Sequence, residues 1–219
     1  IICLYDKMFL EFTIQLSKAL SQSLPGKEAQ YKMAPYREAV DAKFKNQKAA
    51  KTAGVLILIY PVNNVPHLVL TRRPTYDGHH SAQISFPGGK KEERDESFMH
   101  TALRETEEEI GVATKSIKII GELSDLYIPP SNFKVYPFVG VSEIRPQFLK
   151  DPKEVDEIIE LSIPDLLKDE ILKSKELKLA AGFNFETPYF DLHNHVVWGA
   201  TAMILNELRE ILLCLRRAR

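Results

Sequence analysis

The sequence predicts an α/β protein in which helices are layered on a β-sheet. Three observations lead to that class. A continuous apolar run from Gly54 to Tyr60 is typical of a strand buried on both faces. An amphipathic segment that ends at Gly111 predicts a central helix, and apolar residues repeat at helical spacing from Gly199 to Arg217. Strands combined with long helices favour helices packed on a sheet.

The first fifty residues are expected to form an N-terminal helix and an irregular lead-in, and residues 51–219 the main domain. Residues 8–24 carry apolar side chains at helical spacing and end at Pro25-Gly26. This helix is expected to pack on the domain or on a second copy, which makes it a candidate homodimer element. Its polar face has few basic residues, which disfavours a membrane surface. Residues 27–52 lack a long apolar period.

The strands are expected mainly in the middle of the chain. The apolar run and His67–Thr71 flank the turn residues Asn63-Asn64, a pattern typical of a hairpin, and the second strand ends in Arg72-Arg73. Further strands are expected at residues 83–86, 117–123, 133–141 and 157–163, with a tight turn at Gly88-Gly89 and a stiff Pro-rich loop at 127–132.

The C-terminal part is expected to hold a short helix, a hairpin and the long final helix. Pro164 suits the first turn of a helix. Residues 188–192 and 195–198 flank a polar His193-Asn194 turn and predict a hairpin. Trp198 is open to two interpretations, a half-buried core residue or a surface on which an adenine base stacks.

The central helix has well-defined ends and two contrasting faces. Asp95 or Ser97 can cap its start, and Gly111 is the expected left-handed stop. One side is expected to be apolar and the other acidic. The apolar side holds Met99, Leu103, Thr106 and Ile110, and the acidic side holds Glu105, Glu108 and Glu109.

The acidic side of this helix predicts a metal site. Like charges at i,i+4 repel, and Glu108 and Glu109 lie at the helix C-terminus, where the dipole disfavours anions. A bound cation would offset both costs, and carboxylates suit Mg²⁺ or Mn²⁺. The alternative is a solvated acidic face. The surrounding Gly88-Gly89, Arg104 and Gly111 favour the metal site.

Composition excludes several classes of function. The formal net charge is −1, which gives no sign of a nucleic-acid surface. The chain has only two cysteines, Cys3 and Cys214, which is too few for a disulfide framework and fits a reducing, cytoplasmic location. No apolar run reaches membrane-spanning length, and the first residues lack the features of a signal peptide.

Two further groups of side chains could bind ligands. Arg72 and Arg73 lie at a strand end, and guanidinium groups suit phosphate oxygens, although a surface basic pair is the alternative. His79 and His80 could bind a metal, but neighbouring loop residues rarely both point at one ion.

The residues around the central helix resemble a known signature. Arg104-Glu105-Thr106, Glu108-Glu109 and Gly111-Val112, preceded by Gly88-Gly89, are similar to the Nudix box of hydrolases that act on nucleoside diphosphates linked to another moiety. Thr106 stands where an aliphatic residue is usual, and one extra residue lies between Gly89 and Arg104.

The flanking residues resemble the coenzyme A pyrophosphatase branch of that family, which also has the extra residue. The similarity covers roughly residues 50–205. Its motifs here are Leu70-Thr71-Arg72-Arg73, Phe86-Pro87-Gly88-Gly89, Pro188-Tyr189-Phe190 and Trp198-Gly199-Ala200-Thr201-Ala202. The chain departs from the branch at Pro74, Gly78 and Ala82.

This resemblance implies a Nudix-like α/β/α sandwich around a mixed sheet, and hydrolysis of the diphosphate of coenzyme A or an acyl derivative into 3′,5′-ADP and a phosphopantetheine. The implied ligands of Mg²⁺ or Mn²⁺ are the Gly89 carbonyl, Glu105, Glu108 and Glu109. Arg104 would orient the glutamates by pairing with Glu96 or Asp95. Arg73 would contact the substrate's phosphate, and Arg72 is the weaker candidate.

The resemblance leaves the general base and the substrate open. Glu105 or Glu157 would take the proton from water, and Glu154 is the second candidate in the later region. The same box serves ADP-ribose, dinucleoside polyphosphates and oxidised nucleotides, so the partner is a nucleotide-type small molecule. A non-catalytic module that senses nucleotides or coenzyme A on the same fold is the alternative of another class.

Overall fold

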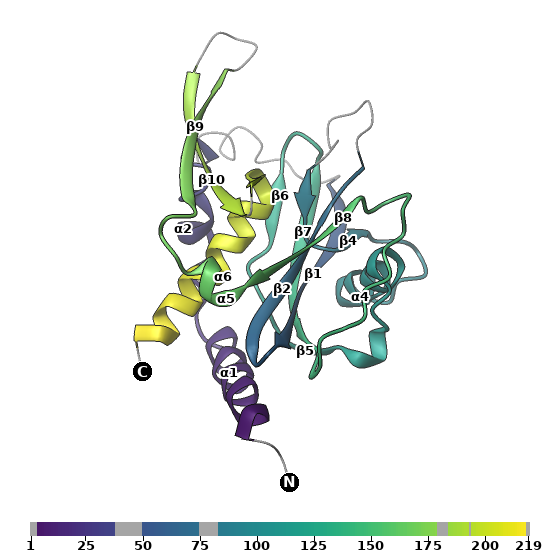
Figure 1. The fold of residues 1–219 in the computed structure, drawn as a ribbon. Coiled ribbons are helices and arrows are strands. Elements are labelled where there is room, and N and C mark those ends of the chain that lie inside the picture. The colour runs from purple at the N-terminus through teal and green to yellow at the C-terminus, as the bar shows by residue number, and fades with distance from the viewer. Residues whose placement is uncertain (1–3, 38–49, 75–82, 179–183, 193, 218–219) are drawn as a thin grey trace.

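The computed structural model describes residues 4–37, 50–74, 83–178, 184–192 and 194–217 (Figure 1). The helices are α1 (Leu4–Leu20), α2 (Gly26–Tyr31), α4 (Phe98–Ile110), the 3₁₀ turn η1 (Thr114–Ser116), α5 (Ile163–Leu166) and α6 (Gly199–Arg217). The strands are β1 (Lys51–Val62), β2 (Val65–Arg72), β3 (Ile84–Ser85), β4 (Gly88–Lys90), β5 (Lys118–Glu122), β6 (Leu126–Ile128), β7 (Phe133–Val141), β8 (Glu157–Ser162), β9 (Leu172–Lys178), β10 (Asn184–Leu192) and β11 (His195–Val197).

The main sheet is mixed, and β1 is its central strand. The order is β3-β2-β1-β7-β5, with β4 added to β1, β6 to β7 and β8 to β2. β1 and β7 run parallel from the pair Lys51–Phe133 to Ile59–Val141, whereas the other pairings are antiparallel. The expected hairpin is confirmed, because β1 and β2 pair around Asn63 and Asn64, which both have positive φ.

Strand β1 is buried on both faces, as its continuous apolar run predicted. Leu56, Leu58 and Tyr60 pack in the cluster that includes α4, while Ile57 and Ile59 pack in the cluster that includes α6. All five side chains are fully buried. Alternation along one strand therefore joins two helical layers through the sheet.

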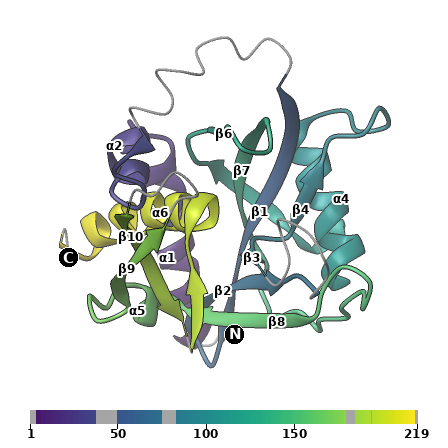
Figure 2. The same cartoon turned by 90° about the horizontal axis from the view of Figure 1, so that it is seen from above.

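The layers form the predicted α/β/α sandwich. Figures 1 and 2 show α4 on one side of the sheet and α1, α2 and α6 on the other. A small second sheet, β11-β10-β9, packs through Phe190, Leu192 and Val197 into the cluster that includes α6. Among the described residues, no helix is both long and apolar enough to cross a membrane.

Several expected elements differ from those observed. The helix expected at 8–24 is α1, which ends at Leu20, and the segment expected to be irregular contains α2. The expected Gly88-Gly89 turn is strand β4, and part of the expected 127–132 loop is β6. Both short strands exist because they pair with β1 and β7, which local sequence does not reveal. Strand β9 was not expected.

The central helix matches its predicted ends but not its whole apolar face. The Ser97 side chain caps α4 by accepting a bond from the His100 N–H at 3.1 Å, and Gly111 ends it with φ of 72°. Leu103, Thr106 and Ile110 are buried as expected. Met99, which shares that side of the helix by spacing, is 40% exposed at the first turn.

A buried carboxylate on α6 fastens the N-terminal segment to the main sheet. Glu207 is fully buried and accepts hydrogen bonds from the Gln30 Nε2 at 2.8 Å and from two backbone N–H groups. Those backbone donors are Gly26 at 3.1 Å and Ser124 at 3.2 Å. One side chain therefore joins α2, α6 and the connection between β5 and β6.

We predict that Glu207→Ala lowers the free energy of unfolding by roughly 3 kcal/mol or more, because it leaves three donors without their acceptor in a dry site. Urea denaturation measures the change. Glu210→Ala is the matched control on the same helix, since it removes only the partly exposed pair with Lys32 and should cost less than about 1 kcal/mol. Equal losses in the two variants would contradict the fastening role of Glu207.

Candidate active site

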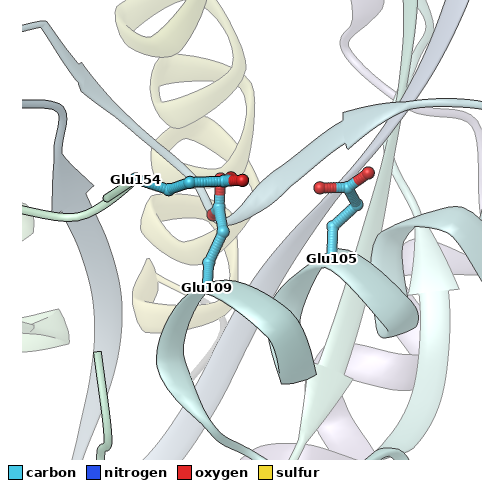
Figure 3. A group of neighbouring side chains, drawn as sticks. All are labelled: Glu105, Glu109 and Glu154. Atoms are coloured by element: carbon cyan, nitrogen blue, oxygen red, sulfur yellow. The ribbon is translucent and has the colours of Figure 1, made fainter. Parts of the chain in front are cut away.

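Three carboxylates meet where α4, β4 and the segment before β8 come together. Glu105 and Glu109 lie on α4, and Glu154 comes from the segment that leads into β8 (Figure 3). One oxygen of each lies within 4.8 Å of the others. We call this group the acidic trio.

Glu109 is the buried member of the trio. Its side chain accepts a hydrogen bond from the Gly88 N–H at 3.2 Å, which links the helix to β4. Burial raises the pKa of Glu109 to about 8, and the charges of Glu105 and Glu154 add to the rise. The Arg73 charge and the Gly88 hydrogen bond oppose it. A site that raises the pKa of a carboxyl this far favours either a proton or a cation on it.

Glu105 lies directly against the backbone of Gly89. A β-carbon placed on Gly89 would lie 2.4 Å from the Glu105 Cδ, so only glycine lets the strand approach the carboxylate this closely. The ladder pair Gly89–Gly54 fixes this approach. Burial raises the pKa of Glu105, although the neighbouring Arg104 charge lowers it in part.

Arg104 connects the trio to a buried anion. Its Nε and Nη2 donate to the two Asp95 carboxylate oxygens at 2.9 and 3.0 Å, and Nη2 also lies 2.8 Å from Glu105. Asp95 accepts further bonds from the Thr101 hydroxyl and the Glu92 N–H. Of the two partners expected for Arg104, the structure selects Asp95. The arginine's hydrogen bonds hold the pKa of Asp95 well below its usual range.

The segment that carries Glu154 is fixed by the end of the helix. The Leu149 N–H donates to the Ile110 carbonyl and the Asp151 N–H to the Glu109 carbonyl, both at 2.9 Å. These bonds satisfy carbonyls that a helix end leaves free. A β-carbon on Gly111 would lie 2.8 Å from the Leu149 Cβ, so this glycine permits both the left-handed stop and the close contact.

The other end of that segment is tied to β2. The Asp156 N–H donates to the Arg72 carbonyl at 2.8 Å, and Val155 is fully buried. The Glu154 N–H donates to the Asp151 carbonyl, which closes the turn that carries Glu154. The exposed Glu154 carboxylate is therefore presented to the trio by anchored backbone on both sides.

Two glutamates expected at the site lie outside the trio. Glu108 points to Arg104 at 2.8 Å and to Arg94 at 3.1 Å, and half of its side chain is exposed. Glu157 lies 3.1 Å from Arg72 and 3.4 Å from the His195 Nε2. The structure thus brings Glu105 and Glu109 together with Glu154, which sequence reasoning ranked second to Glu157.

The two candidate arginines differ in their surroundings. Arg72 pairs with Asp156 at 2.6 Å and with Glu157, so its charge is already matched. Arg73 is close enough to Glu109 to lower the pKa of that carboxyl. Arg72 is the last residue of β2, whereas Arg73 lies just beyond the strand. His79 and His80 lie outside the described residues.

The donors of this site fit a hard divalent cation. Carboxylate oxygens within 4.8 Å of one another, beside the backbone of Gly89, are the oxygen ligands that Mg²⁺ and Mn²⁺ prefer. Glu109 is also buried with little compensation for its charge, which a cation would supply. Arg104 and Asp95 would hold Glu105 in place for that role.

Comparison with known proteins identifies relatives of this chain. The model of the NUDIX domain matches residues 50–181. The chain is 36% identical over 155 residues to the human "Mitochondrial coenzyme A diphosphatase NUDT8", an alignment that covers 70% of this chain and 66% of that protein. It is 32% identical over 145 residues to the "Uncharacterized Nudix hydrolase NudL" of Yersinia pestis (strain Pestoides F), covering 66% of this chain and 72% of that protein.

A solved structure supports the same fold. The Nudix hydrolase RenU from M. smegmatis superposes with a TM-score of 0.50 at 12% sequence identity, over 75% of this chain and 88% of that one. At this identity the likeness concerns the mixed sheet and its flanking helices alone.

We predict that Asp95→Asn lowers the free energy of unfolding by about 3 kcal/mol at neutral pH, because it removes the charge of the buried carboxylate that accepts two hydrogen bonds from Arg104. The folded-state pKa of Asp95 is depressed, so its stabilisation is present above the unfolded pKa of about 3.9 and is lost as pH falls through the folded pKa. Denaturation followed from neutral to acid pH should show a smaller decline in the variant than in the wild type.

The exposed pair of Glu92 with Arg94 provides the control for this prediction. Glu92→Gln should cost less than about 1 kcal/mol and leave the acid decline unchanged. An Asp95→Asn protein with the wild-type acid profile would show that Asp95 is not the group responsible.

Proposed function

The chain belongs to the Nudix hydrolase family, and from that premise we propose that it hydrolyses the diphosphate bond of coenzyme A or an acyl-coenzyme A. The products would be 3′,5′-ADP and a 4′-phosphopantetheine. The observation that carries hydrolysis is the acidic trio held beside Gly88 and Gly89. The coenzyme A part is supported by the human relative named as a coenzyme A diphosphatase.

The proposed mechanism uses two members of the trio to hold a cation that would bind the reacting diphosphate. Glu105 and Glu109, with the Gly89 carbonyl, would hold Mg²⁺ or Mn²⁺. Such an ion, when bound, neutralises diphosphate charge and lowers the pKa of water. Arg73 would pair with a phosphate oxygen, and Arg104 would keep Glu105 oriented through Asp95. Water then attacks one phosphorus in line with the departing phosphate.

Glu154 is the proposed general base. A base needs a carboxylate that is within hydrogen-bond reach of the attacking water and free to take its proton. Glu154 is the exposed member of the trio, whereas Glu157 is engaged by Arg72 and lies near His195. Glu105 is the remaining candidate from the sequence, but the proposed mechanism uses it as a metal ligand, and Arg104 already occupies its carboxylate at 2.8 Å.

Other nucleotide substrates carry the same reacting group, and two compartments suit this chain. ADP-ribose, dinucleoside polyphosphates and oxidised nucleotides carry the same reacting diphosphate, and a sensing module would bind without turnover. The human relative is named mitochondrial, while the cysteine content of this chain suits a reducing compartment such as the cytoplasm.

We predict that, with Mg²⁺ or Mn²⁺, the protein releases 3′,5′-ADP from coenzyme A in preference to hydrolysing ADP-ribose, diadenosine polyphosphates or 8-oxo-dGTP. Product masses identify the bond that is cut. EDTA should abolish turnover, and Glu109→Gln should reduce it by orders of magnitude without unfolding the protein. Preference for another diphosphate would remove the coenzyme A assignment and keep the chemistry. Metal binding without any turnover would favour the sensing module.

We predict that Glu154→Gln lowers kcat about 10²- to 10⁴-fold with little change in metal affinity, the usual effect of losing a general base. Glu157→Gln is the matched comparison three residues away and should change kcat far less. Steady-state kinetics at saturating metal, with calorimetric metal titration of both variants, measures the difference. The reverse order of the two losses would assign the proton to Glu157.

A further inference from the structure

We propose that Lys175, Tyr189 and Trp198 form a recognition site for the nucleotide end of the substrate, with a base stacked on the Trp198 ring and a phosphomonoester paired with Lys175. We call these three residues the aromatic–lysine site. The inference rests on the proposed function, because it assigns the part of the substrate that lies beyond the diphosphate.

The geometry places one cation against two rings. The Lys175 Nζ lies 5.6 Å from the centroid of the Tyr189 ring and 5.6 Å from that of the Trp198 ring. These distances are within the range of cation–π attraction. Trp198 is 39% exposed, so it is a surface residue and not part of the core. A large ring open to solvent beside a held ammonium group offers both stacking area and charge.

Of Lys173 and Lys175, only Lys175 lacks a carboxylate partner among the described residues. Lys173, on the same strand, forms an ion pair with Asp191. Among the described residues, no carboxylate contact is recorded for Lys175. The ladder pair next to it, Glu176–Glu186, belongs to the opposite face because side chains alternate along a strand. Lys175 can therefore pair with an incoming phosphate without first breaking an ion pair.

A buried polar atom lies beside Lys175 in the ladder. Thr187 pairs with Lys175 in register, and its side chain is fully buried. Its Oγ1 has no hydrogen-bond partner within the part of the chain that the structure describes. Buried hydroxyls are normally satisfied, so an unpartnered one next to a cation is consistent with a polar ligand group at this place.

The aromatic–lysine site is joined to the rim of the acidic trio. Trp198 directly follows β11, whose His195 lies 3.4 Å from Glu157. At the start of α6, the Thr201 hydroxyl donates to the Ile84 carbonyl at 2.9 Å. Seen from above in Figure 2, α6 with the small sheet and α4 lie on opposite sides of β1 and β3.

The separation suits an extended substrate. Ile84 is four residues before Gly88, so the chain between them spans at most about 14 Å. Trp198 is three residues before Thr201, which adds at most about 11 Å. A nucleotide bound at Trp198 could thus present its diphosphate toward Gly88. Stacking is tolerant of the base, and lysine supplies the preference for a phosphorylated ribose.

Direct binding tests this site without catalysis. Trp198 is the only tryptophan of the chain, so its fluorescence reports on stacking. Titration with adenosine 3′,5′-bisphosphate in EDTA should quench the emission, and 5′-AMP should bind at least about tenfold more weakly, because a charged hydrogen bond is lost. Lys175→Ala should remove that difference, while Lys173→Ala should keep it. An absent quench, or a Lys175→Ala protein that still binds the bisphosphate about tenfold more tightly than 5′-AMP, would overturn the proposal.

Kinetics separates this proposal from the proposed function. For Lys175→Ala, KM should rise about tenfold or more for coenzyme A and stay within about twofold for dephospho-coenzyme A, with kcat unchanged for both. Equal changes for the two substrates would overturn the role of Lys175. If the wild type hydrolyses neither substrate but the bisphosphate still quenches Trp198, the coenzyme A assignment fails while the nucleotide site stands.

Discussion

Repulsion between three carboxylates is the constraint around which this structure is arranged. Two ionised carboxylates 4.8 Å apart repel by on the order of 3 kcal/mol at an effective dielectric constant of about 20. Backbone hydrogen bonds hold the elements that carry these carboxylates together. β4 is pinned to β1, the Gly88 N–H supports Glu109, and the segment that carries Glu154 is bonded to the end of α4. Three carboxylates held together by this many backbone contacts point to a metal site more strongly than an acidic helix face does.

The helix that carries the chemistry could be predicted in detail because its signals are local. Ser97 caps it, Gly111 ends it, and the spacing of Leu103 and Ile110 sets its buried face. Spacing gives only an angle around the helix, so it could not show that Met99, on the same side, is exposed. The pairing of Arg104 was narrowed to two acids by sequence, and the choice of Asp95 depends on which one the loop buries.

The parts that could not be predicted depend on contacts between distant segments. β4 and β6 are too short to show periodicity and form through pairing with β1 and β7. β9 is rich in lysine, so its sequence shows no alternation of apolar and polar residues. Glu154 and Glu157 are equivalent in sequence, three residues apart in an acidic stretch. The register of β8 on β2 separates them, because it pairs Glu157 with Arg72 and leaves Glu154 beyond the strand.

The residues proposed for catalysis and those proposed for nucleotide recognition lie on different parts of the fold. The acidic trio is fixed by bonds among residues 88–111 and 149–156. The small sheet reaches this region through His195 near Glu157, and α6 reaches it through Thr201 on the Ile84 carbonyl. In the proposed arrangement, substitutions on the small sheet would change nucleotide preference without moving the carboxylates. Helix α6 connects β3 with the N-terminal segment. Its first turn bonds to β3, and Glu207 in its middle bonds to α2 and the β5–β6 connection. Through Glu207, the N-terminal segment is therefore linked to the helix whose first turn contacts β3.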